Sequence, residues 1–170
     1  MKALALHPSQ ALGVSCGADQ MLIAWDFEGR LVERFLGHMA IIDDVDIDPT
    51  GTLVASVSRD FTLKVHGLHD GKLRYSVNLG RRSPKAVCFT DPRTVVVANY
   101  WGSLLRVDLA GGTITQRRIA KNGIGAISCS GDDLIAVSYD GSVYRVRASD
   151  LVVMSQLSAM VQRLQPSPIF

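Results

Sequence analysis

A histidine, a serine and an aspartate lie close together in the sequence and are the side-chain types of a nucleophilic triad. They are His38, Ser56 and Asp60. The serine of a hydrolase triad attacks from a strained turn that exposes its hydroxyl between a strand and a helix. Ser56 instead lies inside the strand-like segment 53–57. We therefore interpret the three residues as a structural hydrogen-bond network and expect no catalytic residue.

Two other groups of side chains have metal-binding chemistry but not the spacing that it needs. The acidic run at residues 43–48 lacks the glycine and the final glutamate of a calcium-binding loop. Cys16, Cys88 and Cys129 lie far apart in apolar segments, without a neighbouring cysteine or histidine to complete a zinc site. We predict three buried free thiols, no metal site and no cofactor.

Two basic stretches have the charge to contact an anionic ligand. Residues 80–85 contain Arg81, Arg82 and Lys85, and residues 117–121 contain two arginines and a lysine. Clustered cations contact phosphate backbones, but the whole chain is nearly balanced, with 18 Lys and Arg against 16 Asp and Glu. Binding of nucleic acid or another acidic ligand, with Arg81 and Arg82 as contacts, is therefore the alternative function and not the leading one.

An internal repeat predicts the elements that position these side chains. Four segments align with one another, at residues 17–27, 58–68, 99–109 and 138–148. Their equivalent turn residues, spaced 41, 41 and 39 positions apart, are Asp19, Asp60, Trp101 and Asp140. Each repeat contains four short runs rich in Val, Ile, Leu and Thr, which are separated by turn residues. This period is typical of four-stranded β-propeller blades.

We therefore predict an all-β chain of four blades, each a four-stranded antiparallel sheet, that together form one propeller unit. The predicted blades are residues 1–36, 37–78, 79–119 and 120–157. A tail, residues 158–170, follows them, and the spacing of its apolar residues favours a short helix. A sheet of this size cannot cover both of its apolar faces, so successive blades must stack on one another.

Trp25-Asp26, Gly37-His38 and the turn residue Asp60 resemble the WD-repeat family of β-propellers. The resemblance covers residues 1–157. In that family a His, a Ser or Thr, an Asp and a Trp form a structural hydrogen-bond network in each blade. The resemblance implies the network residues Ser15, Asp19 and Trp25 in the first repeat, His38, Ser56 and Asp60 in the second, and Asp140 in the fourth. His66 stands at the tryptophan position of the second repeat.

The resemblance also implies a binding rim, because ligands of this family usually dock where the tight turns emerge. The residues beside the turn positions are Arg59, Phe61, Tyr100, Trp101 and Tyr139. Tyrosine, tryptophan and arginine are enriched at the energetic centres of protein interfaces. We expect these residues to contact protein partners. The alternative for Phe61 and Trp101 is that they pack inside their turns.

Four blades are fewer than the seven or eight that the resembled family more often uses, so we expect an incomplete ring. Its terminal blades would expose apolar faces, and such faces are covered by partners or aggregate. We predict that other polypeptide completes the ring, as a homodimer, as a hetero-complex, or as another part of the same gene product.

The leading functional prediction is a non-catalytic protein-protein interaction scaffold in a larger intracellular complex. An enzyme with a site in the propeller channel is less favoured, because no phosphate-binding loop, metal-ligand spacing or convergent acid pair is present. The first apolar run is broken by His7-Pro8 before it could form a signal sequence, and no window is apolar enough to span a membrane. We expect a cytoplasmic protein without membrane contact.

Overall fold

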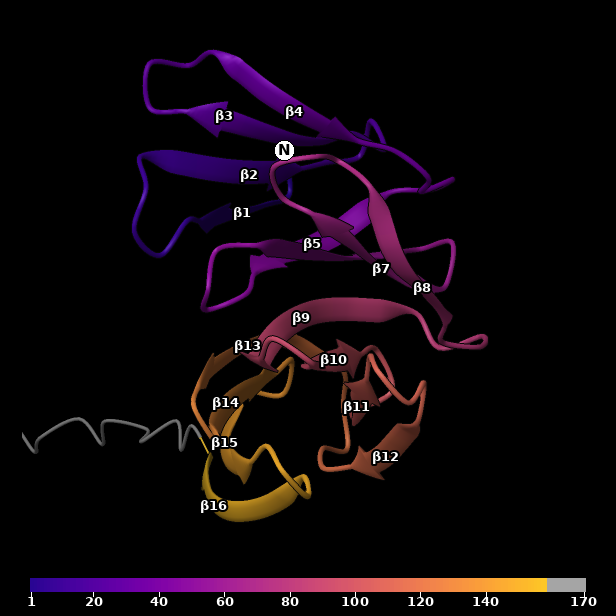
Figure 1. The fold of residues 1–170 in the computed structure, drawn as a ribbon. Coiled ribbons are helices and arrows are strands. Elements are labelled where there is room, and N and C mark those ends of the chain that lie inside the picture. Colours follow the sequence, from indigo (N-terminus) through magenta and orange to yellow (C-terminus); the bar gives the residue numbers. More distant parts are fainter. Residues whose placement is uncertain (159–170) are drawn as a thin grey trace, which may run out of the picture.

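The structure is a computed structural model that describes residues 1–158. These residues form sixteen strands and no helix, and therefore no helix that could span a membrane. The strands pair into four antiparallel sheets of four strands, which Figure 1 shows as separate blades. The predicted all-β fold of four-stranded blades is confirmed. The helix predicted in the tail falls on residues outside the described part of the chain, apart from Ser158, which ends the last strand.

Each blade is a meander in which consecutive strands pair. Blade 1 contains β1 (Ala3–Leu6), β2 (Leu12–Cys16), β3 (Leu22–Asp26) and β4 (Leu31–Phe35). Blade 2 contains β5 (Ile42–Ile47), β6 (Leu53–Ser58), β7 (Thr62–Gly67) and β8 (Leu73–Asn78). Blade 3 contains β9 (Pro84–Asp91), β10 (Thr94–Asn99), β11 (Ser103–Asp108) and β12 (Ile114–Arg118). Blade 4 contains β13 (Ile124–Ser130), β14 (Asp133–Ser138), β15 (Ser142–Arg147) and β16 (Val152–Ser158).

The first strand of each blade lies at the centre of the assembly. Strand β1 contacts β5, β5 contacts β9, and β9 contacts β13. All four of these strands line one central cavity of about 260 Å³. The blades are therefore arranged around an axis as in a propeller, with their later strands toward the outside.

The core consists of three apolar clusters, each formed between two consecutive blades. Val14 of blade 1 and Val45 of blade 2 belong to the first cluster, and Val57 of blade 2 and Val95 of blade 3 to the second. The third joins blades 3 and 4. Full burial of one such side chain stabilises the fold by about 1.5–3 kcal/mol. Stacking of apolar blade faces is thus the main stabilising interaction of this arrangement.

The four sheets do not close into a ring, and each terminal blade has an uncovered face (Figure 1). Leu4 of blade 1 and Val45 of blade 2 occupy equivalent places, because each pairs with the serine of the adjacent strand. Val45 is 4% exposed, whereas Leu4 is 55% exposed. Val137 and Leu157 are likewise exposed on blade 4. The prediction of an incomplete ring with apolar terminal faces is confirmed.

The tight turn between the second and third strands has the same backbone conformation in every blade. The residue after the turn position has a positive φ of 66° at Gln20, 65° at Phe61, 77° at Gly102 and 81° at Gly141. Glycine adopts this left-handed conformation without steric cost, whereas other residues are strained there. Blades 1 and 2 therefore form the turn although Gln20 and Phe61, at the positive-φ position, are strained in this conformation.

The prediction of three free thiols is wrong for two of the cysteines. Cys88 and Cys129 form a disulfide, with their Cα atoms 6.1 Å apart. Cys88 lies in β9 and belongs to the cluster between blades 3 and 4, and Cys129 lies in β13 and packs against that cluster. Val87 and Ile127 are equivalent, since they pair with Val97 and Ala136, so the two cysteines are one residue out of register with the repeat and lie on opposite faces of their sheets. Neighbouring blades therefore bring them together across the blade interface. Cys16 is free and buried, and burial raises its thiol pKa to about 12.

Candidate interaction sites

Blade 2 brings together the three residues that were expected to form its network. The Nδ1 atom of His38 lies 2.9 Å from Asp60 Oδ2, and its Nε2 atom lies 2.9 Å from Ser56 Oγ. Burial lowers the pKa of His38, so the ring is neutral near pH 7. Because a carboxylate only accepts hydrogen bonds, Nδ1 carries the proton and Nε2 accepts from the Ser56 hydroxyl.

This order of hydrogen bonds is that of a catalytic triad, but the environment is not. Ser56 is 0% exposed, so no substrate reaches its hydroxyl. Burial alone would raise the pKa of Asp60, yet its pKa is lowered to about 2. The hydrogen bonds from Thr62, the Met39 N–H and His38 cause this lowering, because they favour the charged carboxylate. The geometry therefore favours a structural role.

Blades 1 and 4 contain smaller parts of the same arrangement. In blade 1 the Trp25 Nε1–H donates to Ser15 Oγ over 2.9 Å. Asp19 accepts from the Met21 N–H at 3.2 Å, within its own turn. In blade 4, Asp140 accepts from the Ser142 N–H at 2.9 Å. Among the described residues, the complete chain of aspartate, histidine and serine is a feature of blade 2.

His66, at the position expected for tryptophan, interacts with the connection between blades 1 and 2. Its Nε2 atom donates to the Leu36 carbonyl oxygen at 2.9 Å, and its ring centroid lies 5.5 Å from that of Phe35. The side chain is buried, and its Nδ1 atom has no hydrogen-bond partner within the described part of the chain. His66 thus replaces the tryptophan as a packing residue without joining the network of Ser56.

An exposed aromatic cluster unites three of the expected partner-binding residues. The ring centroids of Tyr100 and Tyr139 are 5.9 Å apart, and those of Tyr100 and Trp101 are 6.1 Å apart with the rings edge to face. The Lys85 ammonium lies 5.9 Å above the Tyr100 ring. Trp101 is 61% exposed, so it does not pack inside its turn. We refer to Lys85, Tyr100, Trp101 and Tyr139 as the aromatic cluster.

The remaining candidates are connected to this cluster to different degrees. Arg59 binds the buried carboxylate of Asp43 with two guanidinium nitrogens, at 2.9 and 3.2 Å. Lys85 lies 3.7 Å from the same carboxylate, so Asp43 links Arg59 to the aromatic cluster. Phe61 forms no aromatic ring pair within residues 1–158, although its side chain is partly exposed.

The basic stretches offer fewer free cations than their sequence indicates. Lys85 is paired with Asp43, and the guanidinium of Arg118 donates to the carbonyl oxygens of Ala120 and Lys121. Arg81 and Arg82 are exposed in the connection before β9. The structure therefore does not strengthen the nucleic-acid alternative.

Two carboxylates of the acidic run have a role that sequence reasoning missed. Asp44 accepts from the Val87 N–H at 2.9 Å, and Asp46 accepts from the Phe89 N–H at 2.8 Å. These bonds join β5 to β9 beside the central cavity. Burial raises the pKa of each carboxyl to about 6, against the opposing effect of the N–H donors. The sequence signal that could have indicated this role is the alternation of Asp44 and Asp46 within an innermost strand.

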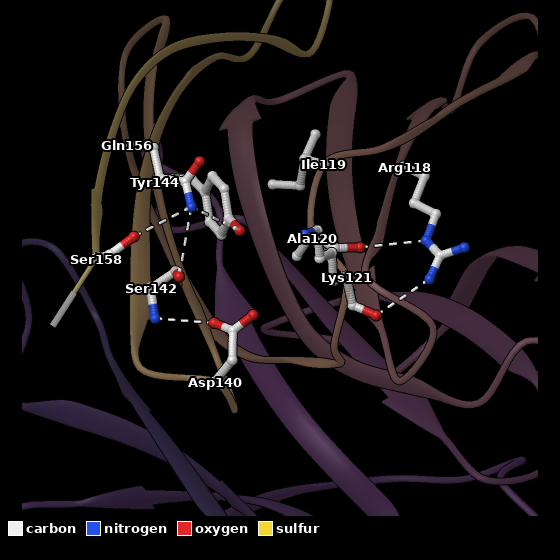
Figure 2. Close-up of a pocket in the computed structure, with 9 residues that line it drawn as sticks. All are labelled: Arg118, Ile119, Ala120, Lys121, Asp140, Ser142, Tyr144, Gln156 and Ser158. Atoms are coloured by element: carbon white, nitrogen blue, oxygen red, sulfur yellow. Dashed lines mark hydrogen bonds between the residues drawn. The ribbon is translucent and has the colours of Figure 1, made fainter. Parts of the chain in front are cut away.

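A groove of about 710 Å³ lies between the end of blade 3 and blade 4, as Figure 2 shows. One wall carries polar side chains of blade 4, and the other is formed by the connection from β12 to β13. We call it the inter-blade groove; its lining residues are Arg118, Ile119, Ala120, Lys121, Asp140, Ser142, Tyr144, Gln156 and Ser158. From the sequence, Asp140 was singled out as a network residue, and Arg118 and Lys121 only as members of the second basic stretch. Within residues 1–158, no group of three or more His, Cys, Asp or Glu side chains is placed to hold a metal ion.

Comparison with known proteins agrees with this architecture. The family described as "WD domain, G-beta repeat" matches residues 29–66. The chain is 30% identical over 104 residues to the MST50-interacting protein 11 of Pyricularia oryzae. It has the same identity, over the same length, to the small ribosomal subunit protein RACK1 of Neurospora crassa. Each match covers 61% of this chain and 33% of the relative, so the chain matches about a third of the length of these relatives.

Proposed function

Because this chain is a WD-repeat protein built of β-propeller blades, we propose that it acts as a non-catalytic protein-interaction scaffold in a larger intracellular complex. The observation that carries the proposal is the aromatic cluster. It presents three large aromatic side chains at the surface beside a cation, at the tight turns of blades 3 and 4. Rigid aromatic side chains combine a large contact area with a small loss of conformational freedom on binding, which is why they dominate interface energies.

The cluster also has the polar component that a specific interface needs. Arg59 and Lys85 are held in place by Asp43, whose side chain is buried beneath them. Pairing to a buried carboxylate fixes the long basic side chains before a partner arrives, and this reduces the entropy that binding must overcome. We infer that the partner segment places aromatic or aliphatic groups on Tyr100 and Tyr139 and a polar group beside the lysine.

The apolar terminal faces form the second part of the proposal. Leu4 and Leu6 on blade 1 and Val137 on blade 4 are exposed at places where blades 2 and 3 bury their equivalents, and Leu157 on the outer strand of blade 4 is exposed as well. We propose that further polypeptide covers both faces, from a second copy, from another subunit or from the same gene product. Size-exclusion chromatography with light scattering tests this. A stable monomer of this chain that binds no hydrophobic dye at either face would contradict it.

The names of the relatives are consistent with a scaffold. One is named for its interaction with another protein, and the other is named as a component of the small ribosomal subunit. By analogy, we propose a cytoplasmic location for this chain. The disulfide between Cys88 and Cys129 offers a check, because disulfides are uncommon in that compartment. Thiol labelling of protein taken directly from cells should find both cysteines reduced if the location is cytoplasmic.

The central experiment is affinity purification with quantitative mass spectrometry, comparing the unchanged chain with Tyr100→Ala and Tyr139→Ala. Removal of an aromatic hot spot typically costs at least about 2 kcal/mol of binding energy, or roughly thirtyfold in affinity. Each substitution should therefore deplete the specific partners strongly. Tyr75→Ala is the matched control, because Tyr75 is also an exposed tyrosine but lies on the outer strand β8. Equal recovery of partners with all three variants would refute the proposed role of the cluster.

A further inference from the structure

The inter-blade groove lies where blade 4 lacks the histidine of blade 2. His38 stands four residues before Ile42, the first residue of β5, and Ala120 stands four residues before Ile124, the first residue of β13. Ile42 and Ile124 are equivalent, since each pairs with the last residue of the following strand, Ser58 or Ser138. Ala120 therefore occupies the position of His38 and contributes a methyl group in place of an imidazole ring.

The carboxylate that binds this histidine in blade 2 is nevertheless retained in blade 4. Asp140 accepts from the Ser142 N–H at 2.9 Å, as Asp60 accepts from the Thr62 N–H at 3.0 Å. In blade 2 the other side of the carboxylate is occupied by His38 at 2.9 Å. In blade 4 both Ala120 and Asp140 line the groove instead. The groove thus includes the space that an imidazole fills in blade 2.

Blade 4 also offers substitutes for the serine that completes the network. Ala136 pairs with Ile127 as Ser56 pairs with Val45, so the hydroxyl that bonds His38 Nε2 is missing. The hydroxyl of Tyr144 and the side-chain amide of Gln156, 3.3 Å apart, line the same wall of the groove. Figure 2 shows them on the side where Asp140 lies. The second nitrogen of an imidazole ring in the groove, the one that does not face Asp140, therefore has hydrogen-bond donors available.

The charges around the groove favour a neutral donor over a cation. The pKa of Asp140 is lowered, first by the Ser142 N–H, so this side chain is an ionised acceptor at neutral pH. The opposite wall includes Arg118 and Lys121, whose positive charges oppose a second cation in the same space. A neutral imidazole satisfies both conditions, because it donates one N–H to the carboxylate and carries no charge. His38, which is neutral through burial, shows the same pairing in blade 2.

We propose that the inter-blade groove binds a histidine side chain of a partner peptide, with its imidazole at the place that His38 occupies in blade 2. This rests on the proposed function as a protein-interaction scaffold and identifies a second contact, separate from the aromatic cluster. The groove volume of about 710 Å³ exceeds a single ring and leaves room for the flanking peptide. A space shaped by the absence of a side chain can bind a small molecule that replaces it, as engineered core cavities bind benzene.

The test uses 4-methylimidazole, the side chain of histidine as a free molecule, at a pH above its pKa. It is titrated into the unchanged chain while amide chemical shifts are followed by NMR. We expect saturable shifts at the amides of Gly141 and Ser142, with a dissociation constant on the order of millimolar for a fragment of this size. Asp140→Asn should weaken binding at least tenfold. Asp19→Asn, which changes the equivalent turn aspartate of blade 1, should leave it unchanged.

A filled groove supplies an independent variant. Ala120→His together with Ala136→Ser restores the two missing members beside Asp140. This variant should abolish the shifts caused by 4-methylimidazole and raise the melting temperature. The unchanged chain failing to bind 4-methylimidazole saturably, or Asp140→Asn binding it equally well, would overturn the proposal. Tighter binding of methylguanidinium would also overturn it, in favour of a cationic side chain. None of these outcomes bears on the aromatic cluster, which the tyrosine variants test separately.

Discussion

Asp60→Ala should destabilise this chain far more than the same change at Asp140, although the two residues occupy equivalent turns. Asp60 accepts hydrogen bonds from His38, from the Met39 N–H and from both the N–H and the hydroxyl of Thr62. Loss of the carboxylate leaves the His38 Nδ1–H and the Met39 N–H without their acceptor. A buried donor left unsatisfied costs about 1–3 kcal/mol. We expect a loss of about 2–3 kcal/mol of unfolding free energy.

The pKa of Asp60 gives a second route to this magnitude. It falls from the reference value of 3.8 to about 2, so the folded state stabilises the ionised carboxylate by about 2 kcal/mol. The sign follows from linkage, because a lowered carboxyl pKa stabilises the fold above pH 3.8 and this stabilisation disappears as the pH falls toward 2. The difference between the unchanged chain and Asp60→Ala should therefore be full at pH 7 and should shrink below pH 4.

Urea unfolding, monitored by tryptophan fluorescence at pH 7 and at several pH values below 4, measures these differences. Trp25 and Trp101 are unchanged in both variants. Asp140→Ala is the matched control, because Asp140 lies in the same kind of turn but has no histidine partner among the described residues. Equal falls in the two variants, or an Asp60→Ala effect that persists at pH 2, would show that the network of His38 does not stabilise blade 2 as argued. The comparison requires an unchanged m-value, since repeat arrays can lose cooperativity.

Three further predictions concern the fold. The double variant Asp44→Asn with Asp46→Asn should gain stability relative to the unchanged chain as the pH rises from 4 to 8, by at most about 3 kcal/mol per carboxylate. The reason is that a carboxyl group whose pKa is raised to about 6 by folding opposes folding once the pH is high enough to ionise it. Urea midpoints at both pH values measure this, and a pH-independent difference would count against it. Gln20→Gly should raise the melting temperature, since its φ of 66° is strained for a side chain by about 1 kcal/mol. Gly102→Ala should lower it, because the added methyl group would collide with the Ala120 carbonyl oxygen at a φ of 77°.

The architecture was predictable from the sequence because a repeat of about 41 residues leaves few alternatives. Four alternating segments per repeat specify four strands, and stacking is the way such sheets cover their apolar faces. The pairing of Cys88 and Cys129 was missed because the cysteines were judged by local spacing. A separation of about one repeat places residues on neighbouring blades, and a shift of one residue turns them toward each other, so that criterion would have found the pair.

The roles of the carboxylates were less accessible to sequence reasoning. The position of Asp60 in a repeated turn suggested its partners, since the repeat fixes which residues approach the turn. Asp44 and Asp46 instead bond backbone N–H groups of the next blade, and backbone donors leave no trace in the residue types of β9. The inter-blade groove was missed for a related reason. It results from small residues, Ala120 among them, and the absence of a side chain shows only when two blades are compared in space.

Blades 3 and 4 both lack the complete network of blade 2, but they differ in how many of its members are replaced. Val97 and Ala136 stand where blade 2 has Ser56, and both are fully buried in apolar clusters. Removing one partner of a buried hydrogen bond is costly, whereas replacing both partners with apolar groups can be neutral. Blade 3 follows this rule, with Trp101 in place of the turn aspartate. Blade 4 departs from it by keeping Asp140, and a carboxylate retained beside an open groove after its structural partners have gone is the reason to expect a ligand there.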